Sequence, residues 1–277
     1  MEFKSFLVDS SEGKMERCKH TLRLDTYGCG CAHDCAYCYA KAILAFRGNW
    51  DPSDPRVADP DRIREEVAKM EPGTVIRMGG MTDCFQPCER IHGVTRMAIE
   101  ALNDRGIHQI IVTKSDLVAE YMDVLDRDLS HVQVSITSTS DGMNAFKEKA
   151  PAPSRRMEAV RRLSEAGFDV CVRLSPYMPE YVDLGLLRER TGCGKVLVEF
   201  LRVNGSIRKI LDIDYKPFKL KLGGYRHLTL KDKKRMLEPI LGTFDEVSVC
   251  EDVAAHQAYF ANAVNHNPAD CCNLRGV

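Results

Sequence analysis

Residues 27–39 read Tyr-Gly-Cys-Gly-Cys-Ala-His-Asp-Cys-Ala-Tyr-Cys-Tyr and contain four of the chain's twelve cysteines. The stretch follows a run of β-type residues, Thr21–Thr26, and precedes a helical pattern. Within it Cys31, Cys35 and Cys38 have the spacing CxxxCxxC, with an aromatic residue directly before the third cysteine. Three thiolates on one tight loop can ligate three irons of a cubane cluster, which usually has four cysteine ligands. This spacing therefore predicts a cluster with one open iron.

An open coordination position is typical of a reactive metal site, whereas structural sites are closed. The open iron can take a small ligand with an amine and a carboxylate, and S-adenosylmethionine (SAM) carries both groups. Two alternatives remain, a zinc site or ordinary buried thiols. Zinc favours two CxxC pairs, and Cys35–Cys38 has no second pair in the chain. Cys29 is a further thiol in the same stretch, and its presence can change which of these cysteines are the metal ligands.

The composition is that of an ordinary globular protein. The 277 residues are 44% hydrophobic and 29% charged, and the net charge of −1 indicates no special partner. No apolar run reaches the ~18–20 residues of a membrane span. The stretch from Met1 to Arg23 has no apolar signal-peptide core, so we expect a cytoplasmic protein without disulfides. We also expect a monomer that does not contact a membrane.

Short β-type runs alternate with helical patterns along the chain, which predicts parallel βαβ units in an α/β fold. The expected strands are Thr21–Thr26, Thr74–Met78, Gln109–Thr113, Val132–Thr137, Asp169–Leu174, Lys195–Phe200 and Glu246–Cys250. The expected helices are Ala36–Phe46, Pro60–Met70, Gly93–Asp104, Leu117–Leu125, Ser154–Ala166, Leu184–Arg190, Lys231–Leu241 and Asp252–Asn262. A barrel-like sheet, complete or partial, suits this order. A doubly wound sheet is the alternative, although no GxGxxG follows the first strand.

The cysteine motif in this βα context resembles the radical SAM superfamily. The wider pattern Tyr27–Ala40, with Gly79–Pro87 and Val112–Ser115, resembles its spore photoproduct lyase-like branch. The resemblance implies a partial (β/α)6-type barrel over residues 1–201, with residues 202–277 as a C-terminal part of the same domain. It also implies a [4Fe–4S] cluster, SAM, and an electron donor such as flavodoxin or ferredoxin. The reduced cluster would cleave SAM to a 5′-deoxyadenosyl radical, which takes a hydrogen atom from the substrate.

The same resemblance implies candidate SAM contacts at the ends of the strands. It assigns the SAM amine to the glycine-containing segment Gly79, Gly80, Met81 and Thr82, where the family's usual acid is absent and Asp83 is a possible substitute. A simple tight turn is the alternative for this segment. Two cations near strand ends, Lys114 and Arg173, are candidates for the SAM carboxylate.

The fourth predicted strand alternates polar and apolar residues. Its polar residues are expected to face the barrel interior and its apolar residues the helices. Ser135 and Thr137 are therefore candidate ribose contacts, or else their hydroxyls bond to neighbouring strands. Tyr37 resembles the aromatic residue that packs beside the adenine.

Several of the remaining cysteines have more than one interpretation. Spore photoproduct lyases use a cysteine near the end of the second strand as a hydrogen donor, so Cys84 is a candidate catalytic residue, with a buried packing role as the alternative. Near the C-terminus, Cys250, Cys271 and Cys272 can ligate an auxiliary cluster or zinc, form part of a lid, or serve only in packing.

The segment Arg208–Arg235 is strongly basic, with ten Lys/Arg against three Asp, and aromatic residues lie among the charges. Basic side chains bind phosphates and aromatics stack on exposed bases. The candidate nucleic-acid contacts are Lys219, Lys221, Tyr225 and Arg226, on an expected hairpin around Gly223-Gly224. A solvated surface is the alternative interpretation.

The leading hypothesis is hydrogen abstraction from a thymine-derived base in DNA, for isomerisation of a modified thymidine or for lyase repair. A duplex substrate would need its base flipped out. A second hypothesis assigns the radical chemistry to a peptide or small metabolite. A third is a non-catalytic metal-binding nucleic-acid module.

Overall fold

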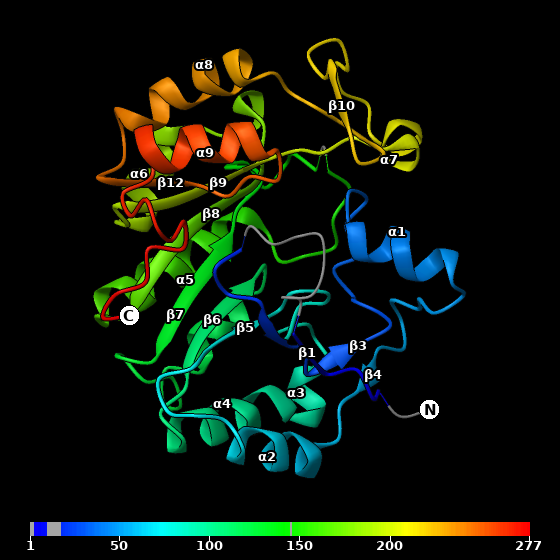
Figure 1. Cartoon of the computed structure of the whole chain (residues 1–277), viewed down its shortest axis with the longest axis vertical. Helices are drawn as coiled ribbons and strands as arrows, with labels where there is room; N and C mark the ends of the chain where they lie inside the picture. Colours follow the sequence, from blue (N-terminus) through cyan, green and yellow to red (C-terminus); the bar gives the residue numbers. More distant parts are fainter. Residues whose placement is uncertain (1–2, 10–17, 145) are drawn as a thin grey trace.

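The computed structural model describes residues 3–9, 18–144 and 146–277 of the chain. At its centre lies an eight-stranded sheet of order β1-β2-β5-β6-β7-β8-β9-β12 (Figure 1). From β2 to β12 all neighbouring strands are parallel, and the edge strand β1 is antiparallel to β2. The strands are β1 (Leu7–Asp9), β2 (Leu22–Leu24), β5 (Val75–Met78), β6 (His108–Thr113), β7 (Ser130–Ser135), β8 (Asp169–Tyr177), β9 (Lys195–Phe200) and β12 (Glu246–Val249). In the described part of the chain the two edge strands do not pair, so the sheet is an open, partial barrel. The predicted fold class is confirmed.

Helices connect the parallel strands, as the alternating pattern predicted. They are α1 (Tyr39–Phe46), α2 (Pro60–Ala68), α3 (Glu89–His92), α4 (Val94–Asp104), α5 (Pro153–Glu165), α6 (Leu184–Thr191), α7 (Gly205–Ile210), α8 (Leu230–Leu241) and α9 (Ala254–Ala263). Several of them start with a side-chain cap. Asp59 accepts a hydrogen bond from Asp61 N and precedes Pro60, and Thr229 caps α8 through Asp232 N. Among the described residues, none of these helices has the length and apolarity to span a bilayer.

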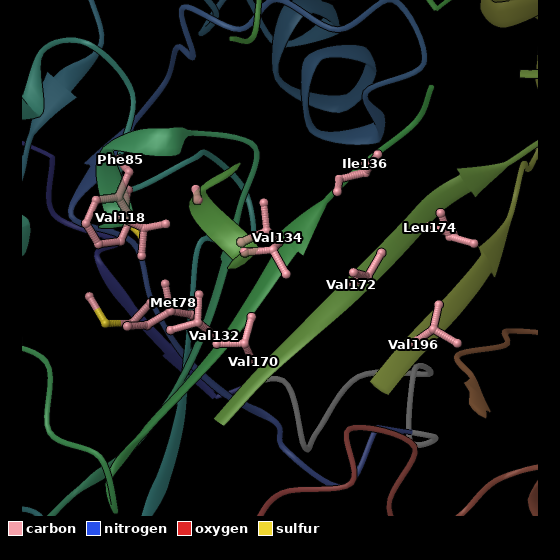
Figure 2. Close-up of a cluster of buried hydrophobic side chains, with 14 of the residues drawn as sticks. Met78, Phe85, Val118, Val132, Val134, Ile136, Val170, Val172, Leu174 and Val196 are labelled. Atoms are coloured by element: carbon pink, nitrogen blue, oxygen red, sulfur yellow. The ribbon is translucent and has the colours of Figure 1, made fainter. Parts of the chain in front are cut away.

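The hydrophobic core lies between the sheet and its helices. Figure 2 shows Val132, Val134 and Ile136 of the β7 segment on the same side as Val172 and Leu174 of β8. Polar residues alternate with them on the opposite, concave face of the sheet, which we call the lumen face. The predicted alternation along this strand is therefore confirmed, and it gives the open barrel a polar interior.

The prediction of a helix over Leu117–Leu125 is wrong. The structure has a 3-10 helix over Asp116–Glu120, started by Ser115, followed by turns. The reason is tertiary: the Tyr121 hydroxyl donates to Glu89 Oε1 at 2.7 Å, and this buried contact holds the chain in tight turns. The sequence pattern also did not predict the short pair β3 (Tyr27–Gly28) and β4 (Arg56–Val57), strand β1, or the short helices α3 and α7.

The segment after β9 adds to the same sheet. Strand β12 pairs in parallel with β9, and the predicted basic hairpin is present as β10 (Leu220–Leu222) and β11 (Tyr225–His227). After α9 the chain runs back along the sheet to the C-terminus (Figure 1). This returning tail, residues 265–277, packs on the lumen face, where Leu274 and Cys272 contact Ile110 of β6.

Candidate active site at the carboxyl edge of the sheet

Residues 29–38, the cysteine loop, lie between β3 and α1 at the carboxyl edge of the parallel strands. Three segments distant in sequence hold the loop by hydrogen bonds. The Cys29 carbonyl accepts from Asp51 N at 2.8 Å, Ala32 N donates to the side chain of Gln86 at 3.0 Å, and the His33 carbonyl accepts from Lys149 N at 2.6 Å. The loop is thus fixed by its surroundings before any cofactor binds.

The thiols of Cys31, Cys35 and Cys38 are free, and Cys35 is buried. Burial raises the pKa of Cys35 to about 12, although the ammonium of Lys114 acts in the opposite direction. Burial also raises the pKa of Cys31 and Cys38. Cys35 is close enough to both other thiols for their charges to interact. Three neighbouring thiols, one buried and two half-buried, that need positive charge to ionise fit the irons of a cubane cluster.

The glycine turn after β5 lies against the cysteine loop. Gly79 has a φ of +80°, and a Cβ there would lie 2.2 Å from the Val112 carbonyl oxygen, so only glycine fits. The Tyr39 hydroxyl, one residue after Cys38, donates to the Gly80 carbonyl. Met81 N donates to Asp25 Oδ1 at 2.9 Å. These contacts bring the predicted amine-binding turn beside the predicted cluster ligands.

The side chains of two polar residues at this turn, Thr82 and Asp83, form hydrogen bonds to other residues of the protein. The Thr82 hydroxyl donates to the Tyr27 carbonyl at 2.5 Å and is buried. Asp83, which we considered as a substitute acid for the SAM amine, accepts from Thr113 Oγ1 and from Lys114 N, each at 2.7 Å. It also accepts from Phe85 N at 2.9 Å, and its Oδ2 lies 3.2 Å from His33 Nε2. Asp83 therefore ties the cysteine loop to the end of β6, and the expected amine contact is not supported.

Lys114 and Tyr37, predicted from different motifs, lie together at this edge. The Lys114 ammonium is 5.4 Å from the centre of the Tyr37 ring and 3.6 Å from Glu148 Oε2, and it donates to the Ser175 carbonyl at 3.3 Å. The Tyr37 hydroxyl donates to the same Glu148 oxygen at 3.0 Å. A cation thus lies beside an aromatic ring of the cysteine loop.

Glu148 is the central residue that sequence reasoning missed. It accepts from Thr137 Oγ1 at 2.8 Å and pairs with the fully buried Arg156 at 2.5 Å. Burial alone would raise its pKa, but Lys114 and Arg156 outweigh that effect and lower it to about 2. In the sequence Glu148 stands between two lysines, which is typical of an exposed charged loop, so no signal pointed to it.

The other predicted SAM contacts fall into two groups. Ser135 and Thr137 are buried near Glu148, and the Ser135 carbonyl accepts from Arg156 Nη1 at 3.0 Å. Arg173 instead forms a 2.7 Å ion pair with Glu199 and donates to Gln133 at 2.8 Å. Its charge is therefore neutralised within the lumen face, whereas the Lys114 ammonium lies beside Tyr37 of the cysteine loop.

Cys84, the candidate hydrogen donor, lies in the hydrophobic core with 1% of its surface exposed. Burial raises the pKa of its thiol well above the ordinary value. The side chain packs among core residues such as Phe85, away from the lumen face. This placement supports the packing role and not the donor role.

One arginine lies between the basic hairpin and the start of α1, directly after the cysteine loop. The guanidinium of Arg202 lies 5.8 Å from the Tyr39 ring centre and 5.7 Å from that of Tyr225. Lys219 and Lys221 are exposed to solvent. The half-buried Arg226 pairs its backbone with Val203. The candidate nucleic-acid contacts therefore start beside the site and extend away from it.

The sequence model of the Radical SAM superfamily matches residues 26–184, more than half of the chain. The chain belongs to the radical SAM superfamily. Membership implies a [4Fe–4S] cluster and SAM as cofactors. The chain is 29% identical over 163 residues to an uncharacterized protein of Methanocaldococcus jannaschii, covering 56% of this chain and 60% of the relative. It is 24% identical over 191 residues to the radical SAM Nalpha-GlyT isomerase of Pseudomonas phage M6, covering 66% of this chain and 40% of the relative.

Solved structures of spore photoproduct lyase share the fold of this radical SAM protein. The complex with dinucleoside spore photoproduct aligns with a TM-score of 0.67 at 18% identity, covering 90% of this chain and 80% of the lyase. A mutant lyase with bound AdoMet and the same dinucleoside aligns with a TM-score of 0.65 at 18% identity, covering 85% of this chain and 78% of the lyase. The predicted resemblance to the lyase-like branch is confirmed at the level of fold.

Proposed function

We propose that this chain is a radical SAM enzyme whose Cys31, Cys35 and Cys38 ligate three irons of a [4Fe–4S] cluster. When bound, the cluster and SAM supply a 5′-deoxyadenosyl radical that takes a hydrogen atom from the substrate. The observation that carries the proposal is the meeting of three free thiols, the Gly79–Gly80 turn and Lys114 at one edge of the sheet.

The protein's own groups would bind and orient SAM. Lys114 is the cation for its carboxylate, because the lysine already lies near the cysteine thiols and its side chain is largely buried. The Gly79–Gly80 turn would accept the amine, and Tyr37 would pack beside the adenine. Ser135 and Thr137 would face the ribose. Glu148 positions both Lys114 and Tyr37 in this arrangement.

The substrate that we propose is a thymine-derived base in DNA, for isomerisation or lyase chemistry. Three features support it: the exposed basic hairpin beside the site, the lyase structures that contain a dinucleoside photoproduct, and the phage relative named as a GlyT isomerase. A flavodoxin or ferredoxin would supply the electron. A peptide or small metabolite is the alternative substrate.

The test is deuterium transfer from DNA that carries thymine or 5-substituted thymine deuterated at the 5-methyl carbon. Reconstituted enzyme, SAM and reductant are incubated with this DNA, and 5′-deoxyadenosine is analysed by mass spectrometry. Deuterium in 5′-deoxyadenosine supports the proposal. Formation of 5′-deoxyadenosine without deuterium contradicts the nucleobase substrate, and its absence under all conditions favours a non-catalytic module. A Cys35→Ala variant is the control for cluster-dependent cleavage.

A further inference from the structure

Three metal-ligating side chains from distant parts of the sequence come together outside the cysteine loop. A ring nitrogen of His20, a carboxylate oxygen of Asp270 and the Cys272 sulfur all lie within 4.8 Å of one another. We call these three residues the tail triad. His20 lies in the segment before β2, and the other two residues lie in the returning tail. The triad thus joins residues that are 250 positions apart in sequence.

Little of the tail triad reaches solvent. His20 and Asp270 are each 4% exposed, and Cys272 is 9% exposed. Cys272 packs with Leu274 against Ile110 of β6, on the lumen face. A buried carboxylate needs a charged partner or a metal ion to offset its loss of hydration. The position is therefore one where a bound cation would contribute to stability.

Hydrogen bonds fix the turn that carries the two tail members of the triad. Asp270 Oδ1 accepts from Cys272 N at 2.9 Å, and the Asp270 carbonyl accepts from Asn273 N at 3.0 Å. Asn273 in turn donates to Glu246 of β12 at 2.6 Å, and its carbonyl accepts from Lys195 of β9. Ligating carboxylates in metal sites are held by hydrogen bonds of this kind. The carboxylate and the thiol are thus positioned by the sheet before any ion binds.

The distances within the triad are close to those of a zinc site. His20 Nε2 lies 2.9 Å from Asp270 Oδ2, and the Cys18 thiol donates to the His20 carbonyl at 3.3 Å. Zinc bonds of about 2.0–2.3 Å in a tetrahedron place the ligand atoms roughly 3.3–3.8 Å apart. Shifts of about 1 Å or less would bring the triad to that geometry. An ion pair between His20 and Asp270 explains their own contact, but not the thiol close to both.

We propose that the tail triad binds one Zn²⁺ ion through a ring nitrogen of His20, a carboxylate oxygen of Asp270 and the thiolate of Cys272. Zinc takes nitrogen, oxygen and thiolate ligands in one tetrahedral site, whereas Ca²⁺ and Mg²⁺ take oxygen ligands. Binding releases the thiol proton to solvent, and the ring nitrogen that ligates the ion carries no proton. One carboxylate and one thiolate balance the two positive charges of the ion, so the buried site is neutral overall. Water takes the fourth position.

The position of the site gives the ion a structural role. In the described part of the chain, the segment before β2 and the returning tail do not pair as strands. A zinc ion between them would fasten the tail to the lumen face from the N-terminal side. The hydrogen bond from Arg275 N to Asp169 of β8, at 3.2 Å, holds the same tail from the other side.

The test uses the untagged triple variant Cys31→Ala, Cys35→Ala and Cys38→Ala, purified anaerobically from medium that contains both zinc and iron. This variant lacks the proposed cluster ligands, so its zinc content does not come from the cysteine loop. Metal analysis is expected to give one zinc per chain. Zinc K-edge spectroscopy is expected to give one sulfur at about 2.3 Å and nitrogen or oxygen atoms at about 2.0–2.1 Å. The cluster-loaded wild-type chain is measured alongside, because the zinc edge reports zinc alone.

Ligand variants then assign the site to the triad. Adding His20→Gln and Cys272→Ser is expected to lower the zinc content at least tenfold. Adding Cys88→Ser and His92→Gln, which remove one thiol and one imidazole at α3, is the matched control and should leave one zinc per chain. If the ligand variants fail to fold, the zinc shell of the wild-type chain decides.

Three results would overturn the proposal. The first is a chain without zinc, which would leave His20 and Asp270 as a buried ion pair only. The second is a zinc shell with no sulfur or with more than one, and the third is zinc that the His20 and Cys272 substitutions do not remove. The outcome is independent of the proposed radical chemistry, since a zinc-containing protein that never cleaves SAM would refute only that chemistry.

Discussion

Glu148 shows how one buried carboxylate can organise the residues of a site. It pairs with Arg156 and Lys114 and accepts the hydroxyl protons of Tyr37 and Thr137 in hydrogen bonds. Without it, the buried guanidinium of Arg156 would lose its counter-ion. The residue therefore connects the stability of the fold to the orientation of the proposed SAM contacts.

We expect Glu148→Gln to lower the free energy of unfolding by about 3–5 kcal/mol, since it leaves a buried charge uncompensated. The measurement is urea unfolding followed by circular dichroism at pH 7. Glu158→Gln, on the exposed side of α5, is the matched control and is expected to change stability by less than about 0.5 kcal/mol. Equal effects of both variants would refute the role of Glu148.

The effect of Glu148→Gln is also expected to depend on pH. The pKa of Glu148 is about 2 in the folded protein against an ordinary value of 4.5, so the carboxylate favours folding above about pH 4.5. This contribution is lost as the pH falls toward 2. The stability difference between the wild type and the variant should therefore be constant from pH 5 to 7 and shrink below pH 4.5. A stability difference between the wild type and the variant that grows on acidification would contradict the role of Glu148 as an ionised, buried counter-ion.

Sequence reasoning reached some of these residues and missed others for a physical reason. The spacing of Cys31, Cys35 and Cys38 and the position of Lys114 at a strand end are local features, and local features can be read from the chain. Glu148 acquires its role only through Arg156 and Lys114, which the fold brings to it. The same holds for Cys84, whose burial follows from packing and not from its neighbours in sequence.

The basic hairpin β10–β11 can be tested at the scale of the element. If it grips a nucleic-acid backbone, Lys219→Ala with Lys221→Ala should weaken oligonucleotide binding and reduce the slope of log affinity against log salt by about 1.5–2. Fluorescence anisotropy over a salt series measures this slope. Arg64→Ala on α2 together with Lys69→Ala, directly after α2, removes the same charge far from the hairpin and is the control. Identical slopes for the two variants would show that the hairpin does not contact the nucleic-acid backbone.

At this scale, periodicity was a good guide wherever an element is long and regular. The parallel strands and the helices α2, α4, α5 and α8 follow the predicted ranges closely. The hairpin was predicted because Gly223-Gly224 separates two alternating runs. The helix expected over Leu117–Leu125 failed because a buried contact between Tyr121 and Glu89 decides the local conformation. Short strands such as β3 and β4 have too few residues to show a period.

The tail after α9 contacts both the start of β8 in the central sheet and the segment before β2. Asp169 of β8 contacts His131 at 2.7 Å and Lys195 at 2.9 Å, and it accepts from Arg275 N at 3.2 Å. His20 and Asp270 add a buried pair between residues 250 positions apart. No local pattern predicts such contacts, because each residue is an ordinary polar residue in its own segment.

We expect Asp169→Asn to loosen the tail and to destabilise the protein by about 3–5 kcal/mol, because His131 and Lys195 lose a buried partner. Hydrogen exchange followed by mass spectrometry should show faster exchange over residues 265–277. Asp245→Asn, whose side chain is exposed beside Arg188, is the control and should leave the tail protected. Unchanged exchange in the Asp169 variant would show that the tail is held by other contacts.

For the molecule as a whole, the central claim is that the cysteine loop leaves one iron open for SAM. The most direct measurement is electron paramagnetic resonance of the reconstituted, dithionite-reduced protein, recorded with and without SAM. The account predicts a [4Fe–4S]⁺ signal that shifts when SAM is added, and 5′-deoxyadenosine in the same sample. A cluster signal that SAM leaves unchanged, with no 5′-deoxyadenosine formed, would contradict it.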